Sequence, residues 1–412
     1  MKKQYVIIGA SAAGIAALTT LKRLDPEADV LVISRDGAAP YNTCLLGSFI
    51  SGSKELDDLM LLSESQLQEL RGCLLFNTEV ISINRAEKNI SAYNKKSNTF
   101  EIIDYDKLLL ATGSEPAQII TEDEQQAGFF SFHTLSDIIS ITNYLDSNSV
   151  EHAVVVGGGI NGIECADALA KKGISVTIIE RSAQLLPHLL NAQANLWLER
   201  YLADKNVMIY TQASIESYIV ANDTKEMILT NGNTIKAHMV IYATGSRPAL
   251  DLARRAGLDI ADALITDQYL TTSDNTIWAA GDCALVTCMH TCQLTRSITW
   301  HDAIAQGVVA AYNMAGIVRA YKGLLLNIHS SFFCINMVYN GFKTQKGYTN
   351  FLRVTSDSCI VYNLDQNNIL QNFIIMGTNA LQQREHWLKL LVSKQKITQD
   401  IQLYSKKVLI TS

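Results

Sequence analysis

Two glycine-rich turns, far apart in the sequence, constrain the fold of this chain more than any other feature. The first turn spans residues 9–14 and follows the apolar run of residues 5–8, while the second spans residues 157–162 and follows residues 153–156. Glycine in the first place of such a turn permits a tight bend, and glycine in the last place lets the following helix pack closely against the strand. Each turn therefore predicts a strand-turn-helix unit within a buried parallel sheet.

The second turn matches the pattern G-x-G-x-x-G in full, with Gly157, Gly159 and Gly162 in the three glycine positions. The next apolar run ends at Glu180, where a carboxylate can accept hydrogen bonds from both ribose hydroxyls of NAD and would repel the 2′-phosphate of NADP. Arg181 follows directly and could accommodate that phosphate. We therefore expect NADH to be the preferred dinucleotide and keep NADPH as an alternative.

The first turn departs from the pattern in two places. Ser11 replaces the middle glycine, and Ser34 stands at the end of the next apolar run, residues 30–33, where a ribose-binding carboxylate is expected. Serine is still small enough to let a pyrophosphate approach the helix N-terminus. Taken alone, this turn is also compatible with an ordinary buried helix start made of small residues.

Composition excludes several classes of protein. The chain has 412 residues, of which 48% are hydrophobic and 18% charged, so it can build large cores and is not disordered. A net charge of −6 argues against nucleic acid as the main partner. Its 8 cysteines show no disulfide-scaffold spacing, which favours the cytoplasm. No apolar stretch reaches the roughly 18 residues of a membrane span. Lys2, Lys3 and the apolar run that follows them resemble a signal peptide, but Gly9 and Gly14 favour a strand-turn-helix unit instead.

Further segments occur in an order that resembles the FAD-dependent pyridine nucleotide-disulfide oxidoreductases. Residues 105–113 read Y-D-K-L-L-L-A-T-G, residues 240–245 read V-I-Y-A-T-G, and residues 276–282 read T-I-W-A-A-G-D. The resemblance covers about residues 4–320. It implies an α/β fold with two Rossmann-like domains, in which an NAD-binding domain (115–245) is inserted into an FAD-binding domain (1–114 and 246–320), followed by a C-terminal α+β domain (321–412) through which a homodimer would form.

The resemblance also assigns cofactor contacts. Asp282 would bind the ribityl chain of FAD, and Trp300 would begin a helix whose positive N-terminus faces the pyrimidine edge of the flavin. The residues expected at FAD are Gly9, Ser11, Ala12, Ala13, Gly14, Ser34, Val80, Ala111, Thr112, Gly113, Asp282 and Trp300. Those expected at NAD are Gly157, Gly159, Ile160, Asn161, Gly162, Glu164, Glu180 and Gly245, with Glu164 facing the nicotinamide or serving only as a carboxylate near the helix start.

The C-terminal segment suggests an antiparallel sheet. Apolar segments at residues 332–338, 351–354, 359–364 and 369–376 are separated by polar turns, and a final helix is expected around residues 380–391. This part resembles the third domain of rubredoxin reductases and of the NADH-binding part of nitrite reductases. No histidine precedes a proline, so the H-P-T triplet of glutathione reductase-like enzymes is absent from the sequence.

Cys44 raises the question of the electron acceptor. Its distance from the first nucleotide unit is similar to that of the single cysteine in the S-F-x-x-C segment of coenzyme A disulfide reductases and NADH oxidases. A cysteine that opens a helix gains from unpaired backbone N–H groups, which favour the nucleophilic thiolate. Cys44 is therefore our candidate catalytic residue for a small thiol or disulfide substrate, a persulfide or a peroxide. The first turn lacks the histidine that accompanies this cysteine in NADH oxidases, which disfavours reduction of oxygen to water.

Two alternatives remain open from the sequence. In one, Cys44 is an inert, buried apolar residue and the protein passes electrons to an iron–sulfur partner such as a rubredoxin or ferredoxin. In the other, the protein is a dinucleotide-binding redox sensor without turnover. A cluster formed by Cys283, Cys288, His290 and Cys292 could suggest zinc or a redox relay. We expect no metal there, because a single compact loop rarely surrounds a metal ion.

Overall fold

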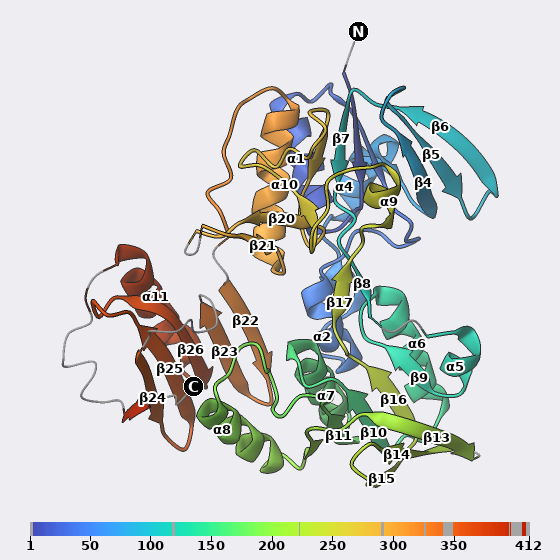
Figure 1. The fold of residues 1–412 in the computed structure, drawn as a ribbon. Coiled ribbons are helices and arrows are strands. Elements are labelled where there is room, and N and C mark those ends of the chain that lie inside the picture. Colours follow the sequence, from blue (N-terminus) through green and yellow to red (C-terminus); the bar gives the residue numbers. More distant parts are fainter. Residues whose placement is uncertain are drawn as a thin grey trace. The chain divides into compact units, whose positions relative to one another are not determined.

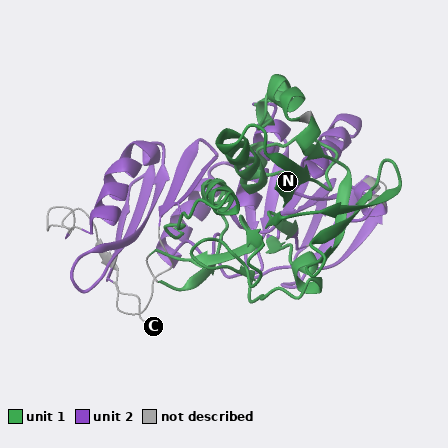
Figure 2. Cartoon of the chain, turned by 90° about the horizontal axis from the view of Figure 1, so that it is seen from above, with its two compact units in different colours: residues 1–45, 54–115, 246–325 green, residues 46–53, 116–245, 326–412 purple. Residues whose placement is uncertain are grey.

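The computed structural model describes residues 3–117, 120–221, 223–289, 292–324, 327–340, 349–394, 396 and 406–408 (Figure 1). The chain divides into two compact units (Figure 2). Residues 1–45, 54–115 and 246–325 form the first unit, and residues 46–53, 116–245 and 326–412 form the second. The C-terminal segment is thus grouped with residues 116–245. The division into three domains with the boundaries given above stays a prediction.

The first unit is built on a parallel sheet of five strands. Its order is β19 (Ile277–Ala279), β7 (Lys107–Leu110), β1 (Gln4–Ile8), β2 (Asp29–Ile33) and β3 (Leu74–Leu75), and every neighbouring pair is parallel. The apolar run predicted to precede the first glycine turn is therefore the central strand, and three of its residues are almost inaccessible to solvent: Val6, Ile7 and Ile8 are 0%, 0% and 7% exposed.

Two helices pack side by side in this unit, α1 (Ala12–Leu24) and α10 (Trp300–Met314). A Cβ atom at Gly307 would lie 2.1 Å from the carbonyl oxygen of Ala13, so the two helices are in backbone contact there. The remaining strands are β4 (Thr78–Asn84), β5 (Asn89–Asn94) and β6 (Thr99–Asp104) in one antiparallel sheet, and β18 (Leu264–Ile265), β20 (Ala284–Thr287) and β21 (Leu294–Arg296) in another sheet. Short helices are η1 (Thr43–Leu45), α3 (Leu56–Leu59), α4 (Glu64–Glu69), η2 (Arg71–Cys73) and α9 (Asp251–Arg255).

The second unit repeats the parallel arrangement. Its five-stranded sheet has the order β12 (Met208–Tyr210), β11 (Ser175–Ile179), β10 (His152–Val156), β16 (Met239–Tyr242) and β9 (Phe129–Ser131), again with parallel pairs throughout. Its helices are α2 (Leu46–Ile50), α5 (Glu122–Gln126), α6 (Leu135–Ser147), α7 (Ile160–Lys171) and α8 (Ala192–Ala203). Short strands β8 (Ser114–Pro116) and β17 (Ser246–Pro248) pair where the chain leaves the first unit and returns to it.

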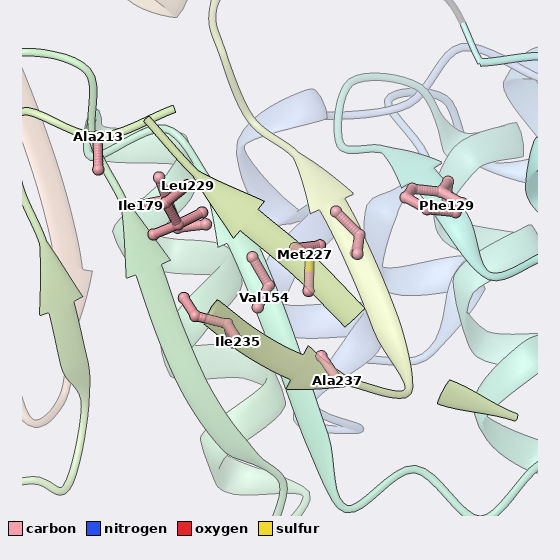
Figure 3. Packing of buried hydrophobic residues seen from close by; sticks show 9 residues of the cluster. Phe129, Val154, Ile179, Ala213, Met227, Leu229, Ile235 and Ala237 are labelled. Atoms are coloured by element: carbon pink, nitrogen blue, oxygen red, sulfur yellow. The ribbon is translucent and has the colours of Figure 1, made fainter. Parts of the chain in front are cut away.

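An antiparallel sheet of β13 (Ile215–Ala221), β14 (Thr224–Leu229) and β15 (Thr234–Ala237) packs against this parallel sheet. Figure 3 shows the shared core, in which Val154 and Ile179 of the parallel sheet lie beside Met227, Leu229 and Ile235 of the antiparallel one. The close packing of these apolar side chains fixes the strands from which the second glycine turn emerges.

The C-terminal segment forms an antiparallel sheet with the order β22 (Asn327–Phe332), β23 (Ile335–Asn340), β26 (Leu370–Gly377), β25 (Ser358–Leu364), β24 (Thr349–Val354) and β27 (Lys406–Val408). Helix α11 (Ala380–Ser393) contacts β23 and β26. The predicted antiparallel sheet and final helix are confirmed.

One strand prediction is wrong. Residues 332–338 are not a single strand, because the chain turns between β22 and β23 at Phe333 and Cys334, whose φ angles are 47° and 66°. Asparagine and glycine usually supply such left-handed turns, and neither occurs there. The turn is held instead by distant groups: the Phe333 N–H donates to Asp167 Oδ1 at 3.0 Å, and Tyr201 donates to the Phe333 carbonyl oxygen at 2.7 Å.

The predicted α/β fold with two Rossmann-like sheets and a C-terminal sheet is confirmed by this arrangement. Among the described residues, no helix is both long enough and apolar enough to cross a bilayer.

Candidate functional site

The first glycine turn is compressed between the ends of neighbouring strands. Gly9 has a φ of 112°, and a Cβ atom there would lie 2.0 Å from the Ala111 carbonyl oxygen. A Cβ atom at Gly14 would lie 1.9 Å from the Gly9 carbonyl oxygen. Neither position can accept a side chain without movement of the backbone. Ser11 is the N-cap of α1 and is exposed, and its side chain makes no capping bond, so it leaves the first N–H groups of α1 available to a bound anion.

The segment after β7 continues this cradle. The Ala111 N–H donates to the Ile8 carbonyl oxygen at 2.8 Å, and the Thr112 hydroxyl donates to the Ala249 carbonyl oxygen at 2.9 Å. Gly113 has a φ of 66°. Ala12 and Ala13 are buried in the first turn of α1. All of these residues are gathered at the carboxyl ends of β1 and β7, the edge of a parallel sheet where dinucleotides bind.

Asp282 and Trp300 belong to the same unit. The Ser114 hydroxyl donates to Asp282 Oδ2 at 3.1 Å, and the preceding Gly281 N–H donates to Gln306 Oε1 of α10 at 2.8 Å. Trp300 is the first residue of α10, whose N-cap Thr299 accepts a hydrogen bond from the Asp302 N–H. The loop that carries Asp282 is therefore fixed to the helix that begins with Trp300.

Two buried polar atoms just before α10 were not anticipated from the sequence. Within the part of the chain described, the hydroxyl of Ser297, which is 0% exposed, and Nε of Arg296 have no hydrogen-bond partner. Buried polar groups are rarely left unpaired in a folded protein, so a ligand atom is the natural partner for them. Together with the cradle at Gly9 and Gly14, they fit a bound FAD. No local pattern marks such residues in a sequence.

Ser34 and Val80 complete the predicted FAD contacts. Ser34 is buried at the end of β2, and its hydroxyl accepts a hydrogen bond from the Asp36 N–H at 3.2 Å. Val80 is buried on β4. The ribose position of this unit thus presents a hydroxyl, where the corresponding position of the second unit presents a carboxylate.

The second glycine turn has nearly the same geometry. Gly157 has a φ of 119°, and its Cβ atom would lie 2.3 Å from the Ala243 carbonyl oxygen, while a Cβ atom at Gly162 would lie 1.9 Å from the Gly157 carbonyl oxygen. Gly159 is the N-cap of α7, and no atom lies within 4 Å of a Cβ built on it. Helix α7 begins at Ile160, inside the predicted turn of residues 157–162.

Glu180 organises this second turn. The carboxylate is 8% exposed, accepts the Gly158 N–H on Oε2 at 2.7 Å, and accepts the Ser182 N–H on Oε1 at 2.6 Å. Each oxygen keeps a second lone pair for a ribose hydroxyl. Arg181 is exposed beside it. The side chain predicted to bind ribose therefore also holds the turn in shape.

A small pocket in the second unit brings several predicted residues together. It is lined by Pro116, Phe132, His133, Asn161, Tyr242, Ala243, Thr244 and Gly245. Asn161 and Gly245 were predicted from the sequence, whereas Phe132, His133 and Tyr242 were not. The A-T-G motif pointed to the end of β16, but the ends of neighbouring strands β9 and β16 meet only in the folded sheet.

Glu164 is half-buried on α7, two residues after Gly162, the last glycine of the second turn. The Ser330 hydroxyl of β22 donates to Glu164 Oε1 at 2.6 Å. Burial raises the pKa of Glu164 to about 7, against the lowering effect of the Ser330 hydrogen bond. Ser330 is a partner from the C-terminal sheet that sequence reasoning missed.

Cys44 lies in the first unit on η1, and its side chain is exposed. The alternative of a buried, inert Cys44 is therefore wrong with respect to burial. The expectation that Cys44 opens an α-helix is also wrong: the next helix, α2, begins at Leu46, and the Cys44 N–H donates to Asn42 Oδ1 at 2.9 Å. The backbone around this thiol is held by an asparagine side chain rather than left with free N–H groups.

The loop behind Asp282 places its cysteines in different environments. Cys283 and Cys288 are buried and Cys292 is exposed, while His290 lies outside the described residues. Burial raises the pKa of the Cys283 thiol, which lies 3.4 Å from the Leu110 and Ala280 carbonyl oxygens. Among the residues that are described, no three cysteine, histidine or carboxylate side chains gather in a way that could hold a metal ion.

Two dinucleotide cradles of this kind define a flavoprotein that takes electrons from a nicotinamide cofactor. The chain belongs to the pyridine nucleotide-disulphide oxidoreductase family, whose model matches residues 3–307. It is 31% identical over 323 residues to the NADH oxidase of Methanocaldococcus jannaschii, covering 78% of this chain and 72% of that protein. It is 28% identical over 314 residues to the rubredoxin-NAD(+) reductase of Pseudomonas putida, covering 76% and 80% of the two chains.

A solved structure extends the likeness over the whole fold. The NAD-dependent persulfide reductase from A. fulgidus matches with a TM-score of 0.88 and 25% identity, over 96% of this chain and 78% of that one. The protein is therefore an FAD- and NAD(P)H-dependent oxidoreductase. Family membership argues against the non-catalytic sensor considered above. The three relatives differ in the electron acceptor that their names imply.

Proposed function

We propose that this enzyme passes a hydride from NADH to FAD and uses Cys44 to deliver the two electrons to a small disulfide, a persulfide or a peroxide. The observation that carries this proposal is the exposed thiol of Cys44, held on a short turn of the unit that contains the FAD cradle. Support comes from the likeness to a persulfide reductase and an NADH oxidase.

The sulfur chemistry balances without another oxidant or reductant. The Cys44 thiolate attacks one sulfur of the substrate, a mixed disulfide forms, and the other sulfur leaves as a thiolate. FAD, when bound, supplies the two electrons that it has received from NADH as hydride, and these cleave the mixed disulfide. With one proton from solvent, NADH and a disulfide yield NAD and two thiols. With a peroxide, the Cys44 thiolate attacks one oxygen and becomes a sulfenic acid, while the O–O bond breaks and the other oxygen leaves as an alcohol or water. The two electrons from FAD then reduce the sulfenic acid to the thiolate with release of water.

We further propose that NADH is the physiological donor. Glu180 would accept the ribose hydroxyls while it holds the second turn, and its charge would repel a 2′-phosphate. The exposed guanidinium of Arg181 leaves slower use of NADPH open. The residues assigned to both cofactors above are part of this proposal, as are a homodimer formed through the C-terminal sheet and a cytoplasmic location, which the lack of disulfide-scaffold spacing among the cysteines supports.

The similarity to a rubredoxin-NAD(+) reductase favours a second candidate function. In that case electrons would pass singly from the flavin to a small iron–sulfur protein, and Cys44 would take no part.

An anaerobic titration separates the two candidates. The purified FAD-containing enzyme is titrated with dithionite, and electrons taken up per FAD are counted. Before the titration, the enzyme is incubated with a small disulfide so that Cys44 forms a mixed disulfide. If the thiol proposal is right, we expect an uptake of about four electrons, two by the flavin and two by the mixed disulfide; if the alternative is right, we expect about two. Cys44→Ser should lower the count to about two.

The matched control is Cys292→Ser, because Cys292 is the other exposed cysteine of the first unit among the described residues. It should leave the count at about four. If Cys44→Ser kept the count at about four, or if the wild-type enzyme took up only about two, the thiol proposal would be wrong.

A further inference from the structure

The second unit contains a half-buried carboxyl group beside the dinucleotide turn. Glu164 lies five residues beyond the N-cap Gly159, or about 7.5 Å along the helix axis at about 1.5 Å per residue. It is half-buried, and the Ser330 hydroxyl donates a hydrogen bond to it at 2.6 Å. Burial brings its pKa to about 7, so the group is divided between its charged and neutral forms near neutral pH.

The C-terminal sheet reaches the same helix a second time. The Phe333 N–H donates to Asp167 Oδ1 at 3.0 Å, while Oδ2 of Asp167 is paired with Lys171 at 2.7 Å. Tyr201 of α8 secures the same turn from the other side, through the Phe333 carbonyl oxygen at 2.7 Å. The hairpin of β22 and β23 is thus fixed on α7, and Ser330 is held in position above Glu164.

Few charged groups face Glu164 from the elements that contact α7. Helix α2 and strand β11 contain no titratable side chain. His152 of β10 bonds to the Lys236 carbonyl oxygen and to Thr177, and His329 of β22 is exposed on the strand face opposite to that of Ser330. Asp167, already paired with Lys171, is the charged neighbour that raises the pKa of Glu164 further. Ser330 is therefore the one polar side chain bonded to this carboxyl group among the described residues.

We propose that Glu164 takes up a proton when a dinucleotide binds at the start of α7, and that Ser330 is the positioning residue that sets the pH of this uptake. The bound pyrophosphate brings negative charge to the helix N-terminus, whose positive potential otherwise favours the carboxylate. Like charge at this distance disfavours the ionised form, and the proton comes from solvent. The C-terminal sheet would thereby tune cofactor binding through a single hydroxyl. This inference rests on the proposed dinucleotide site.

Calorimetry of ADP-ribose binding to the oxidised FAD-containing enzyme tests the proposal without turnover, because this ligand carries the pyrophosphate but lacks the positively charged nicotinamide of NAD. Titrations at pH 6 to 9, in buffers that differ in ionisation enthalpy, give the number of protons taken up. The wild-type enzyme should take up about half a proton near pH 7.5, if binding moves the Glu164 midpoint by about one pH unit. Glu164→Gln should take up none.

Variants of Ser330 test the positioning role. Ser330→Ala removes a hydrogen bond to the ionised form, so the uptake maximum should move upward by about one pH unit. Ser330→Thr keeps the hydroxyl and should restore the wild-type maximum. An unchanged profile in Ser330→Ala would overturn the role of Ser330, even if Glu164→Gln failed to fold.

The remaining outcomes are separable. Unchanged uptake in Glu164→Gln would assign the proton to another group and overturn the proposal. Binding heat without any uptake would overturn only the role of Glu164. Absence of binding heat would overturn the dinucleotide site itself. None of these results depends on whether Cys44 is redox-active.

Discussion

The two glycine turns differ in sequence more than in shape. In both, the first glycine has a φ above 110° and is pressed against the carbonyl oxygen of an alanine on a neighbouring segment, Ala111 or Ala243. In both, the last glycine would place a Cβ atom 1.9 Å from the carbonyl oxygen of the first. The middle position holds Ser11 in the first unit and Gly159 in the second. The backbone thus depends on the outer glycines and tolerates a change at the middle one.

A second difference concerns the end of the following strand. Ser34 accepts one backbone N–H through its hydroxyl, whereas Glu180 accepts two N–H groups, one of them from the glycine turn itself. The second turn is therefore bonded to the carboxylate that is expected to bind ribose. Both turns share a backbone bond, from the Gly9 N–H to the Ile33 carbonyl oxygen in the first unit and from the Gly157 N–H to the Ile179 carbonyl oxygen in the second. The second cradle therefore adds a carboxylate to a support that both have.

The largest effect on cofactor binding is expected when the last glycine of each turn is replaced by alanine. In Gly14→Ala and Gly162→Ala, the new Cβ atom overlaps a backbone oxygen, which costs about 3 kcal/mol and weakens dinucleotide binding about 100-fold. Gly14→Ala should lose FAD during purification. Gly162→Ala should keep FAD but bind NADH weakly. Flavin absorbance and NADH binding by fluorescence measure the two effects. Loss of the same cofactor in both variants would contradict the assignment of one cofactor to each turn.

Helices α1 and α7 provide the next comparison, because Ala16 occupies in α1 the place that Glu164 has in α7. The folded-state pKa of Glu164, about 7, lies above the ordinary glutamate value of 4.5. The folded protein therefore holds the proton more tightly, and its stability falls as the pH rises from the lower value through the higher one. Glu164→Gln abolishes this fall.

We expect Glu164→Gln to be about 2 kcal/mol more stable than wild type at pH 8, relative to their difference at pH 4.5. Denaturant unfolding at the two pH values, with equal FAD content, measures the change. Glu216→Gln, at an exposed site of β13, serves as the control and should stay within about 0.5 kcal/mol at both pH values. Parallel behaviour of the two variants would show that burial of Glu164 has no energetic consequence.

The ends of the second strands are compared by Glu180→Ala and Ser34→Ala. Removal of the Glu180 carboxylate should weaken NADH binding about 10-fold and reduce the discrimination against NADPH by a similar factor. Ser34→Ala removes only one hydroxyl and should change FAD retention less than about 3-fold. Steady-state KM values for both nicotinamide cofactors give the ratio. If the preference for NADH over NADPH were unchanged in Glu180→Ala, Glu180 would not determine it, and Arg181 would be the residue to test next.

The sequence predicted the parts of the fold that depend on local pattern. The strands that precede both glycine turns, the helices that follow them and the final helix all lie where apolar spacing and glycine placement put them. The sequence did not reveal that α7 begins at Ile160, inside the turn of residues 157–162, because Ile160 and Asn161 follow three glycines and carry no helix signal of their own. The turn at Phe333 and Cys334 was missed because its support comes from Asp167 and Tyr201, far away in the sequence.

The same limit explains the unanticipated site residues. Ser330 and Glu164 are 166 residues apart and meet only because the C-terminal hairpin packs on α7. Ser297 is recognised by its burial and its missing partner, and neither property can be read from neighbouring residues. Cys44 was found by its spacing, but its exposure and the hydrogen bond from its backbone to Asn42 are tertiary facts.

The smallest effect is expected at the middle position of the two turns. Gly159 has a φ of −77° and open space around a Cβ atom, so Gly159→Ser introduces no backbone strain. The added hydroxymethyl group enters the space that a pyrophosphate would use, and NADH should bind about 3-fold to 5-fold more weakly with an unchanged melting temperature. Ser11→Gly makes the reverse change at an N-cap, where glycine costs only a few tenths of a kcal/mol, so FAD retention should change less than about 3-fold. A melting temperature for Gly159→Ser as low as that of Gly162→Ala would show that the middle glycine supports the fold, and the two turns would then differ in architecture as well as in sequence.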